Sequence, residues 1–392
     1  MRKEKTGIKQ EQTDRQKSGR KGFAAFLALC PVRHALVLLS GLVILVHLLE
    51  RKNHTLMVFL SERFVRPAHR AMSQFFAHLP FSMAELLIAA GVIGAAVYLI
   101  FQIIQLIRKK ERLKRLYRTL MTAAAAGLTI YALFCVLWGV YYYADDFSVK
   151  SGFQNGPVSV EELTAVTRYF ADMVNEYADQ VPRSADGVCI SDTKEVLAKS
   201  PEVFRMTEQR YPALEGPEIA AKGIFFSRIM SYTDFTGFFF PFTAEANVNT
   251  DQPACDFAAT VAHELSHQRG VAKEQEANFT AVVASLDYGD RDYVYSAALL
   301  AYIHLSNALY KADKDAYMEI RRTFTEEVER DFAYRSAYWK QFETPVQKVS
   351  NTVYEGFLHS YDQTMGLRSY GACVDYLVHY YYEEAAAHME QP

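Results

Sequence analysis

Two histidines and a glutamate in the 392-residue chain have the spacing of a metal-dependent hydrolase site. His263 and His267 are four residues apart, so on a helix both imidazoles project from one face and can bind the same ion. Glu264 follows the first histidine and lies beside that ion. In this His-Glu-x-x-His pattern the imidazoles hold zinc, and the glutamate takes a proton from the attacking water. Residues 257–265 are mostly apolar, and Gly270 is placed to end the helix.

A third metal ligand is expected from a second helix, predicted over residues 273–286, which carries Glu274 and Glu276. Side chains two residues apart on a helix point about 200° apart, so only one of these acids can face the metal. The Glu274 face carries small side chains that allow close helix packing, whereas the Glu276 face is bulkier. A His-His-Glu set with one open position is typical of catalytic zinc, while structural zinc sites are usually closed by cysteines. We predict Glu274 as the ligand, with Glu276 as the alternative.

Several motifs around these residues resemble a known family. The chain is similar to bacterial integral-membrane proteins of the domain-of-unknown-function 3810 family over the stretches 230–237, 240–249, 263–270 and 274–279. The family name carries no activity. The spacing of Glu274 and Asn278 also resembles the Glu-x-x-x-Asp signature of gluzincin peptidases. That resemblance implies that Glu274 binds zinc and that Asn278 replaces the acid that orients a ligand histidine.

Three apolar stretches precede the motif and predict membrane-spanning helices at about 34–49, 86–107 and 120–143. The first 22 residues are polar and basic, as in a disordered cytoplasmic tail. The dense, short basic loop over residues 108–118 belongs in the cytoplasm, which places everything after Tyr143 outside. Residues 50–81 mix apolar and basic positions and predict an amphipathic helix on the outer surface, with a substrate-gating element as the alternative. The lipid bilayer is therefore one expected partner.

The remaining residues, 145–392, predict one soluble domain of mostly helical structure. Ser159 and Glu162 form a capping box that starts a helix running to about residue 180. Aromatic and β-branched residues over 223–249 predict two short strands, and Pro241 favours a sheet edge. By analogy with zinc peptidases, residues 244–248 are expected to pair with an extended substrate, with an ordinary edge strand as the alternative. Further helices are predicted over 193–211, 293–310, 315–331, 345–361 and 370–387.

Other residues of chemical interest have weaker patterns. Tyr370 lies near a glycine-containing turn and is our candidate donor of a hydrogen bond to the oxyanion formed during hydrolysis. His304 lies among apolar neighbours at helical spacing and is interpreted as structural. Cys189, Cys255 and Cys373 have no zinc-binding spacing, so buried thiols are expected, with one unassigned disulfide as the alternative.

Together these patterns predict a mostly α protein, in which a membrane domain over residues 23–144 precedes an α-rich, zincin-like α+β domain with a small sheet. The expected function is that of a membrane-anchored zinc metallopeptidase that cleaves extracytoplasmic peptides or proteins, including those of the cell envelope. The alternative is a non-catalytic sensor or assembly protein stabilised by the metal. The formal net charge of −3 gives no argument for nucleic-acid binding.

Overall fold

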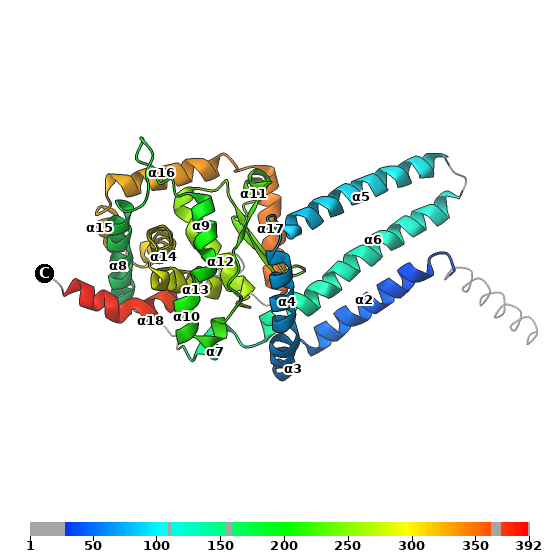
Figure 1. Cartoon of the computed structure of the whole chain (residues 1–392), viewed down its shortest axis with the longest axis horizontal. Coiled ribbons are helices and arrows are strands. Elements are labelled where there is room, and N and C mark those ends of the chain that lie inside the picture. The colour runs from blue at the N-terminus through cyan, green and yellow to red at the C-terminus, as the bar shows by residue number, and fades with distance from the viewer. Residues whose placement is uncertain (1–27, 109–110, 154–157, 362–369, 391–392) are drawn as a thin grey trace, which may run out of the picture. The chain divides into compact units, whose positions relative to one another are not determined.

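The computed structural model describes residues 28–108, 111–153, 158–361 and 370–390, and these residues form two compact units (Figure 1). The first unit comprises residues up to Lys52 and Ile88–Val136, and the second comprises Asn53–Leu87 and Leu137–Pro392. Residues 53–87, which the sequence analysis grouped with the membrane part, therefore cluster with the soluble part in this division. The predicted N-terminal tail lies outside the described residues.

Three of the described helices are long and apolar enough to cross a membrane, and most of their length lies in the first unit. They are Pro31–Glu50 (α2), Met83–Arg108 (α5) and Arg112–Gly139, which consists of α6 (Arg112–Phe134) and a π-helical turn (Cys135–Gly139). Apolar side chains cover these helices on all sides, and most of them are exposed. Two pairs of polar side chains bond between helices: Ser40 to Thr129 at 3.1 Å and Tyr98 to Thr122 at 3.0 Å. The basic run, expected to be a loop, instead lies largely within the first turns of α6.

The second unit begins with α3 (His54–Leu60), a π-helical turn (Ser61–Val65) and α4 (Arg66–Ala77). These residues are fixed to the rest of the unit by charged side chains. Arg66 donates hydrogen bonds to the carbonyls of Ala213 and Glu215, and Lys150 bonds Glu62 at 2.6 Å. The buried imidazole of His69 stacks on Tyr141. The segment predicted as a surface amphipathic helix is thus an integral part of this unit.

The sheet of the second unit has three strands in the order β1 (Lys222–Ile224), β3 (Glu245–Asn249), β2 (Gly237–Phe240). β3 pairs parallel to β1 and antiparallel to β2. Because side chains alternate along a strand, Ala246 and Val248 enter the hydrophobic core while Glu245 and its polar neighbours face the opposite way. β3 is buried at every position even though three of its five residues are polar, and hydrogen bonds satisfy those residues.

Helices build the rest of the unit around α12 (Ala254–Gln268), α13 (Glu274–Tyr288) and α14 (Arg291–Ala312). The capping box at Ser159 is present and starts α8 (Val160–Ala178), as predicted. The helix predicted over 315–331 is wrong, because the chain breaks there into α15 (Lys314–Arg321) and α16 (Glu326–Lys340), with Thr325 capping the second. The remaining helical segments are α7 (Phe147–Ser151), α9 (Thr193–Lys199), α10 (Arg205–Arg210), α11 (Ser227–Tyr232), α17 (Pro345–Ser360), α18 (Tyr370–Met389) and short 3-10 turns at Tyr141–Tyr143, Ser200–Glu202 and Pro212–Leu214.

Candidate metal centre

Helix α12 carries both histidines on one face and ends where the sequence predicted. Gly270 adopts a φ of 86°, a left-handed conformation that only glycine reaches without cost. Its N–H donates to the carbonyl of His267, and the N–H of Val271 donates to the carbonyl of Ser266. This double closure is a Schellman motif. It turns the chain back so that α13 starts four residues later and packs against α12.

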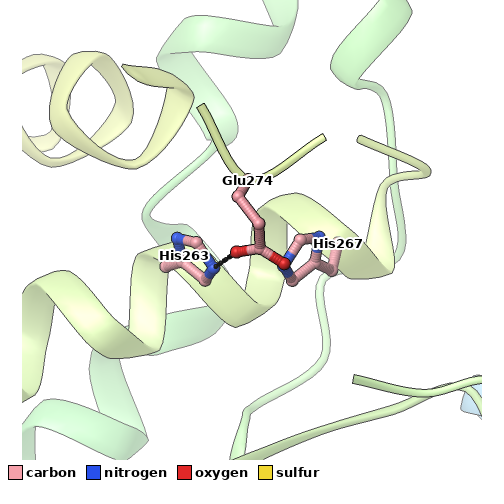
Figure 2. A group of neighbouring side chains, drawn as sticks. All are labelled: His263, His267 and Glu274. Carbon is pink, nitrogen blue, oxygen red and sulfur yellow. Dashed lines mark ion pairs between the residues drawn. The ribbon is translucent and has the colours of Figure 1, made fainter. Parts of the chain in front are cut away.

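The turn brings Glu274 between the two imidazoles (Figure 2). One carboxylate oxygen lies 3.2 Å from His263 Nε2, and the other lies 3.7 Å from His267 Nε2. One ligand atom from each of the three residues falls within 4.8 Å of the other two. The side chains of His263 and Glu274 are 15% and 17% exposed, so the centre is recessed but reached by solvent. These three donors form the only group of this kind among the described residues.

Glu276 points away from this centre. Its carboxylate accepts hydrogen bonds from the backbone N–H groups of Phe147 and Ser148, each at 3.0 Å, and so satisfies the first turn of α7. The hydroxyl of Tyr376 lies 3.4 Å from one of its oxygens. The two acids therefore have separate surroundings, as their 200° separation on the helix requires.

The Nδ1 atoms of both histidines are held by the surrounding protein. His263 Nδ1 lies 2.9 Å from Asn278 Oδ1, and His267 Nδ1 lies 2.6 Å from the carbonyl oxygen of Val271. Both partners are acceptors, so each Nδ1 carries a proton and each Nε2 faces Glu274, where it can offer its lone pair to a metal ion. This arrangement of outer partners is the one that orients metal-binding imidazoles. The donor set and its orientation fit a zinc ion.

Burial and mutual charge shift the pKa values of these groups. Burial alone lowers the pKa of His267, but the adjacent Glu274 carboxylate outweighs it and raises that pKa to about 9. The same contacts work in reverse on Glu274. Its pKa falls well below the usual range, because the two histidines outweigh the effect of burial. A cation is therefore strongly favoured at this position, whether as an imidazolium or as a metal ion.

Glu264 lies next to the donor set in a dry environment. Its side chain is 3% exposed, and burial raises its pKa to about 7 against the attraction of the two histidines. Among the described residues, no protein group bonds to Oε2 of this carboxylate. The backbone of β2 passes so close that a Cβ added at Gly237 would lie 2.5 Å from Glu264 Oε1. A side chain at this position would force Glu264 to shift, and no local sequence pattern predicts this close approach.

Two aromatic contacts of the centre were also missed. The hydroxyl of Tyr354, on α17, donates to Glu274 Oε1 at 2.8 Å. The indole ring of Trp138 meets the ring of His267 edge to face, with centroids 5.9 Å apart. Tyr354 is 80 residues from its partner, and no local sequence pattern predicts that contact. The predicted oxyanion donor, Tyr370, begins α18, but its side chain lies outside the described residues.

The structure corrects the prediction that residues 244–248 receive the substrate at a sheet edge. β3 is the central strand, and both of its edges are occupied by β1 and β2. Main-chain groups that already pair on both sides cannot bind a further strand. Among the described strands, β2 is an edge of the sheet, and it is the strand that touches Glu264.

The other candidate residues do not belong to the donor set. All five cysteines are free and buried. His304 lies on α14, and burial, with smaller effects of His263 and Arg335, lowers its pKa to about 4. It is therefore neutral at pH 7.

Comparison with known proteins assigns the chain to a family but not to an activity. The model of a family described as "Protein of unknown function (DUF3810)" matches residues 61–378, and the chain belongs to this family. The match covers the donor set, Glu264 and all three strands. No curated protein and no solved structure matches the chain.

Proposed function

We propose that this member of the DUF3810 family is a membrane-anchored, zinc-dependent metallopeptidase that hydrolyses peptide bonds of extracytoplasmic substrates. His263, His267 and Glu274 would hold the zinc ion. When bound, zinc supplies a Lewis acid that polarises the scissile carbonyl and makes a water molecule more acidic. Peptides are the preferred substrates, since this helix motif is typical of metallopeptidases, and other amides of the cell envelope are included in the same chemistry.

The observation that carries the proposal is the Glu264 carboxylate, buried beside the three donors. A structural metal site does not need this group, and its burial has a cost because no described protein group satisfies Oε2. A general base, by contrast, needs a free oxygen that can take a proton from water. The proposal therefore assigns Glu264 as that base.

Residues around the donor set would position the metal ligands and the substrate. Asn278 and the carbonyl of Val271 fix the two imidazoles, and Tyr354 orients Glu274. β2 runs past Glu264 with an edge that pairs with no other described strand. An extended peptide would add to this edge through main-chain hydrogen bonds, which would bring its carbonyl toward the base.

The proposal is tested by Glu264→Gln in the purified full chain. Glutamine keeps the size of the side chain but cannot take a proton, so hydrolysis of a peptide library should fall at least about a hundredfold, the scale of losing a general base. Zinc content, measured by mass spectrometry, should stay at the wild-type level. Equal hydrolysis by the glutamine variant and the wild type would refute the mechanism.

The rival function is a sensor or assembly protein in which the metal is only structural. It predicts that Glu264→Gln changes neither zinc content nor any cellular phenotype of the protein. It also predicts that His263→Ala acts through loss of folding alone. A peptidase instead loses activity in both variants, while Glu264→Gln remains folded.

We also propose that the second unit faces the extracytoplasmic side. The support is the run of basic residues at the junction of α5 and α6, which favours the cytoplasm. Reporter fusions at residue 150 test the orientation. A reporter that is active only in the cytoplasm should be silent there, and its activity would place the site on the other side of the membrane.

A further inference from the structure

The first turn of α5 is bound tightly to the sheet of the second unit. Glu245, on the central strand, accepts hydrogen bonds from the backbone N–H groups of Met83 and Ala84 at 3.1 and 2.9 Å. Ser82, just before the helix, donates to Asn247 at 2.6 Å. The helix that is long and apolar enough to span a membrane therefore starts directly on the polar face of the sheet.

A loop of the second unit is fixed to the same turn. The carboxylate of Glu85 accepts from the backbone N–H groups of Phe225 and Phe226 at 3.1 and 2.8 Å. Lys222 reaches across to the carbonyl of Phe81 at 3.0 Å. The residues that follow β1 thus lie beside the N-terminal end of α5, and they cannot move far from it without breaking these bonds.

Four apolar side chains at this place are exposed, and we name them the apolar rim. Phe225 is 86% exposed, Ile229 is 61%, Phe81 is 48% and Phe226 is 47%. Single exposed apolar side chains are ordinary, but a group of them in one place usually marks an interaction site. Lys222 and Glu85 hold the backbone at Phe81, Phe225 and Phe226, so the exposure of these side chains is built into the fold.

We propose that the apolar rim enters the interfacial layer of the lipid bilayer around α5 and holds the second unit against the membrane surface. The occupant is lipid, because the rim is fixed to the turn from which α5 continues as a mostly apolar helix through Ile88–Arg108. A polar loop beside that turn would need no such side chains. Phenylalanine and isoleucine gain free energy when their apolar surface leaves water for the acyl-chain boundary.

This inference depends on α5 crossing the bilayer and not on zinc chemistry. It would keep α11 close to the lipid surface. The sheet would follow, because Asn249 of β3 bonds Ser231 of α11, and β3 pairs with β2, the edge strand beside Glu264. Substrates with a membrane-proximal segment would then meet the site more readily than soluble ones.

The test places an environment-sensitive fluorophore on the rim of the full chain. Phe225→Cys and, separately, Ile229→Cys are labelled with nitrobenzoxadiazole and reconstituted in vesicles of phosphatidylethanolamine and phosphatidylglycerol. The five native cysteines are buried, so labelling of the wild type gives the background. Ile190→Cys is the matched control, because Ile190 is 52% exposed and adjoins Cys189, which bonds to Asp331 of α16 and not to α5.

At both rim positions we expect blue-shifted emission and quenching by acyl-chain nitroxide lipids that is severalfold stronger than at position 190. Emission like that of the control at both rim positions would overturn the proposal. Blue-shifted emission without quenching by the nitroxide lipids would also overturn it, because it would mean that protein covers the rim. Use of two rim positions guards against a single variant that fails to fold, and the reporter fusion at residue 150 separately tests the span itself.

Discussion

Substituting the two acids of α13 by alanine, one at a time, separates metal binding from folding. Glu274 contacts both imidazoles, whereas Glu276 bonds two backbone N–H groups of α7. The two variants make the same change two positions apart on one helix, so differences in helix propensity largely cancel. Glu274→Ala should lose most of the bound zinc, and Glu276→Ala should keep it but unfold more easily.

The size of the second effect follows from the hydrogen bonds. An unsatisfied buried donor costs about 1–3 kcal/mol, and two such donors would be left at Phe147 and Ser148. We therefore expect Glu276→Ala to lose about 3 kcal/mol of unfolding free energy, which lowers the Tm by several degrees in a chain of this size. Glu276→Gln keeps one acceptor oxygen and should recover about half of that loss.

Zinc content is measured by mass spectrometry after purification in the cold, and unfolding is followed by tryptophan fluorescence in detergent. The glutamine variant controls for indirect loss of zinc through unfolding. The reasoning is refuted if Glu276→Ala loses zinc while Glu274→Ala retains it, or if neither variant changes zinc content. The first result would mean that α13 is rotated about its axis.

Two further predictions concern contacts at the centre, and a third concerns the buried imidazole of His69. Gly237→Ala should reduce hydrolysis about a hundredfold at unchanged zinc content, because the new methyl group displaces Glu264. Gly356→Ala, which has open space around it, is the control. Full activity of Gly237→Ala would contradict the close approach. Asn278→Ala should weaken zinc binding about 10–100-fold in a chelator competition, because the His263 imidazole loses the side chain that orients it. Unchanged affinity would show that Asn278 does not support the site. Burial lowers the pKa of His69 from 6.5 to about 4, so the unfolded chain takes up a proton first as the pH falls. The contribution of His69 to the free energy of unfolding should be fully present above pH 6.5 and should fall by about 3 kcal/mol as the pH drops to about 4. A thermal-unfolding pH series checks this, and the same slope in His69→Leu would show that another group is responsible.

The sequence determined the parts of this protein that depend on local spacing. The separation of His263 and His267 by four residues places both on one face of any helix, whatever surrounds it. The capping box at Ser159 and the left-handed turn at Gly270 are equally local, and both occur at the predicted positions. The apolar stretches of the first unit could be recognised because a membrane-spanning helix needs only length and hydrophobicity.

Tertiary structure alone decided the strand order and the surroundings of each acid. Nothing in the residues Glu245–Asn249 distinguishes a central strand from an edge strand, because their polar groups are satisfied by partners far away in the chain, such as Ser82. The contact of Tyr354 with Glu274 likewise depends on how α17 packs. Helical geometry shows that Glu274 and Glu276 face different ways, and the small side chains on the Glu274 face favoured Glu274 as the ligand. The turn at Gly270 and the packing of α13 on α12 then bring it beside the histidines.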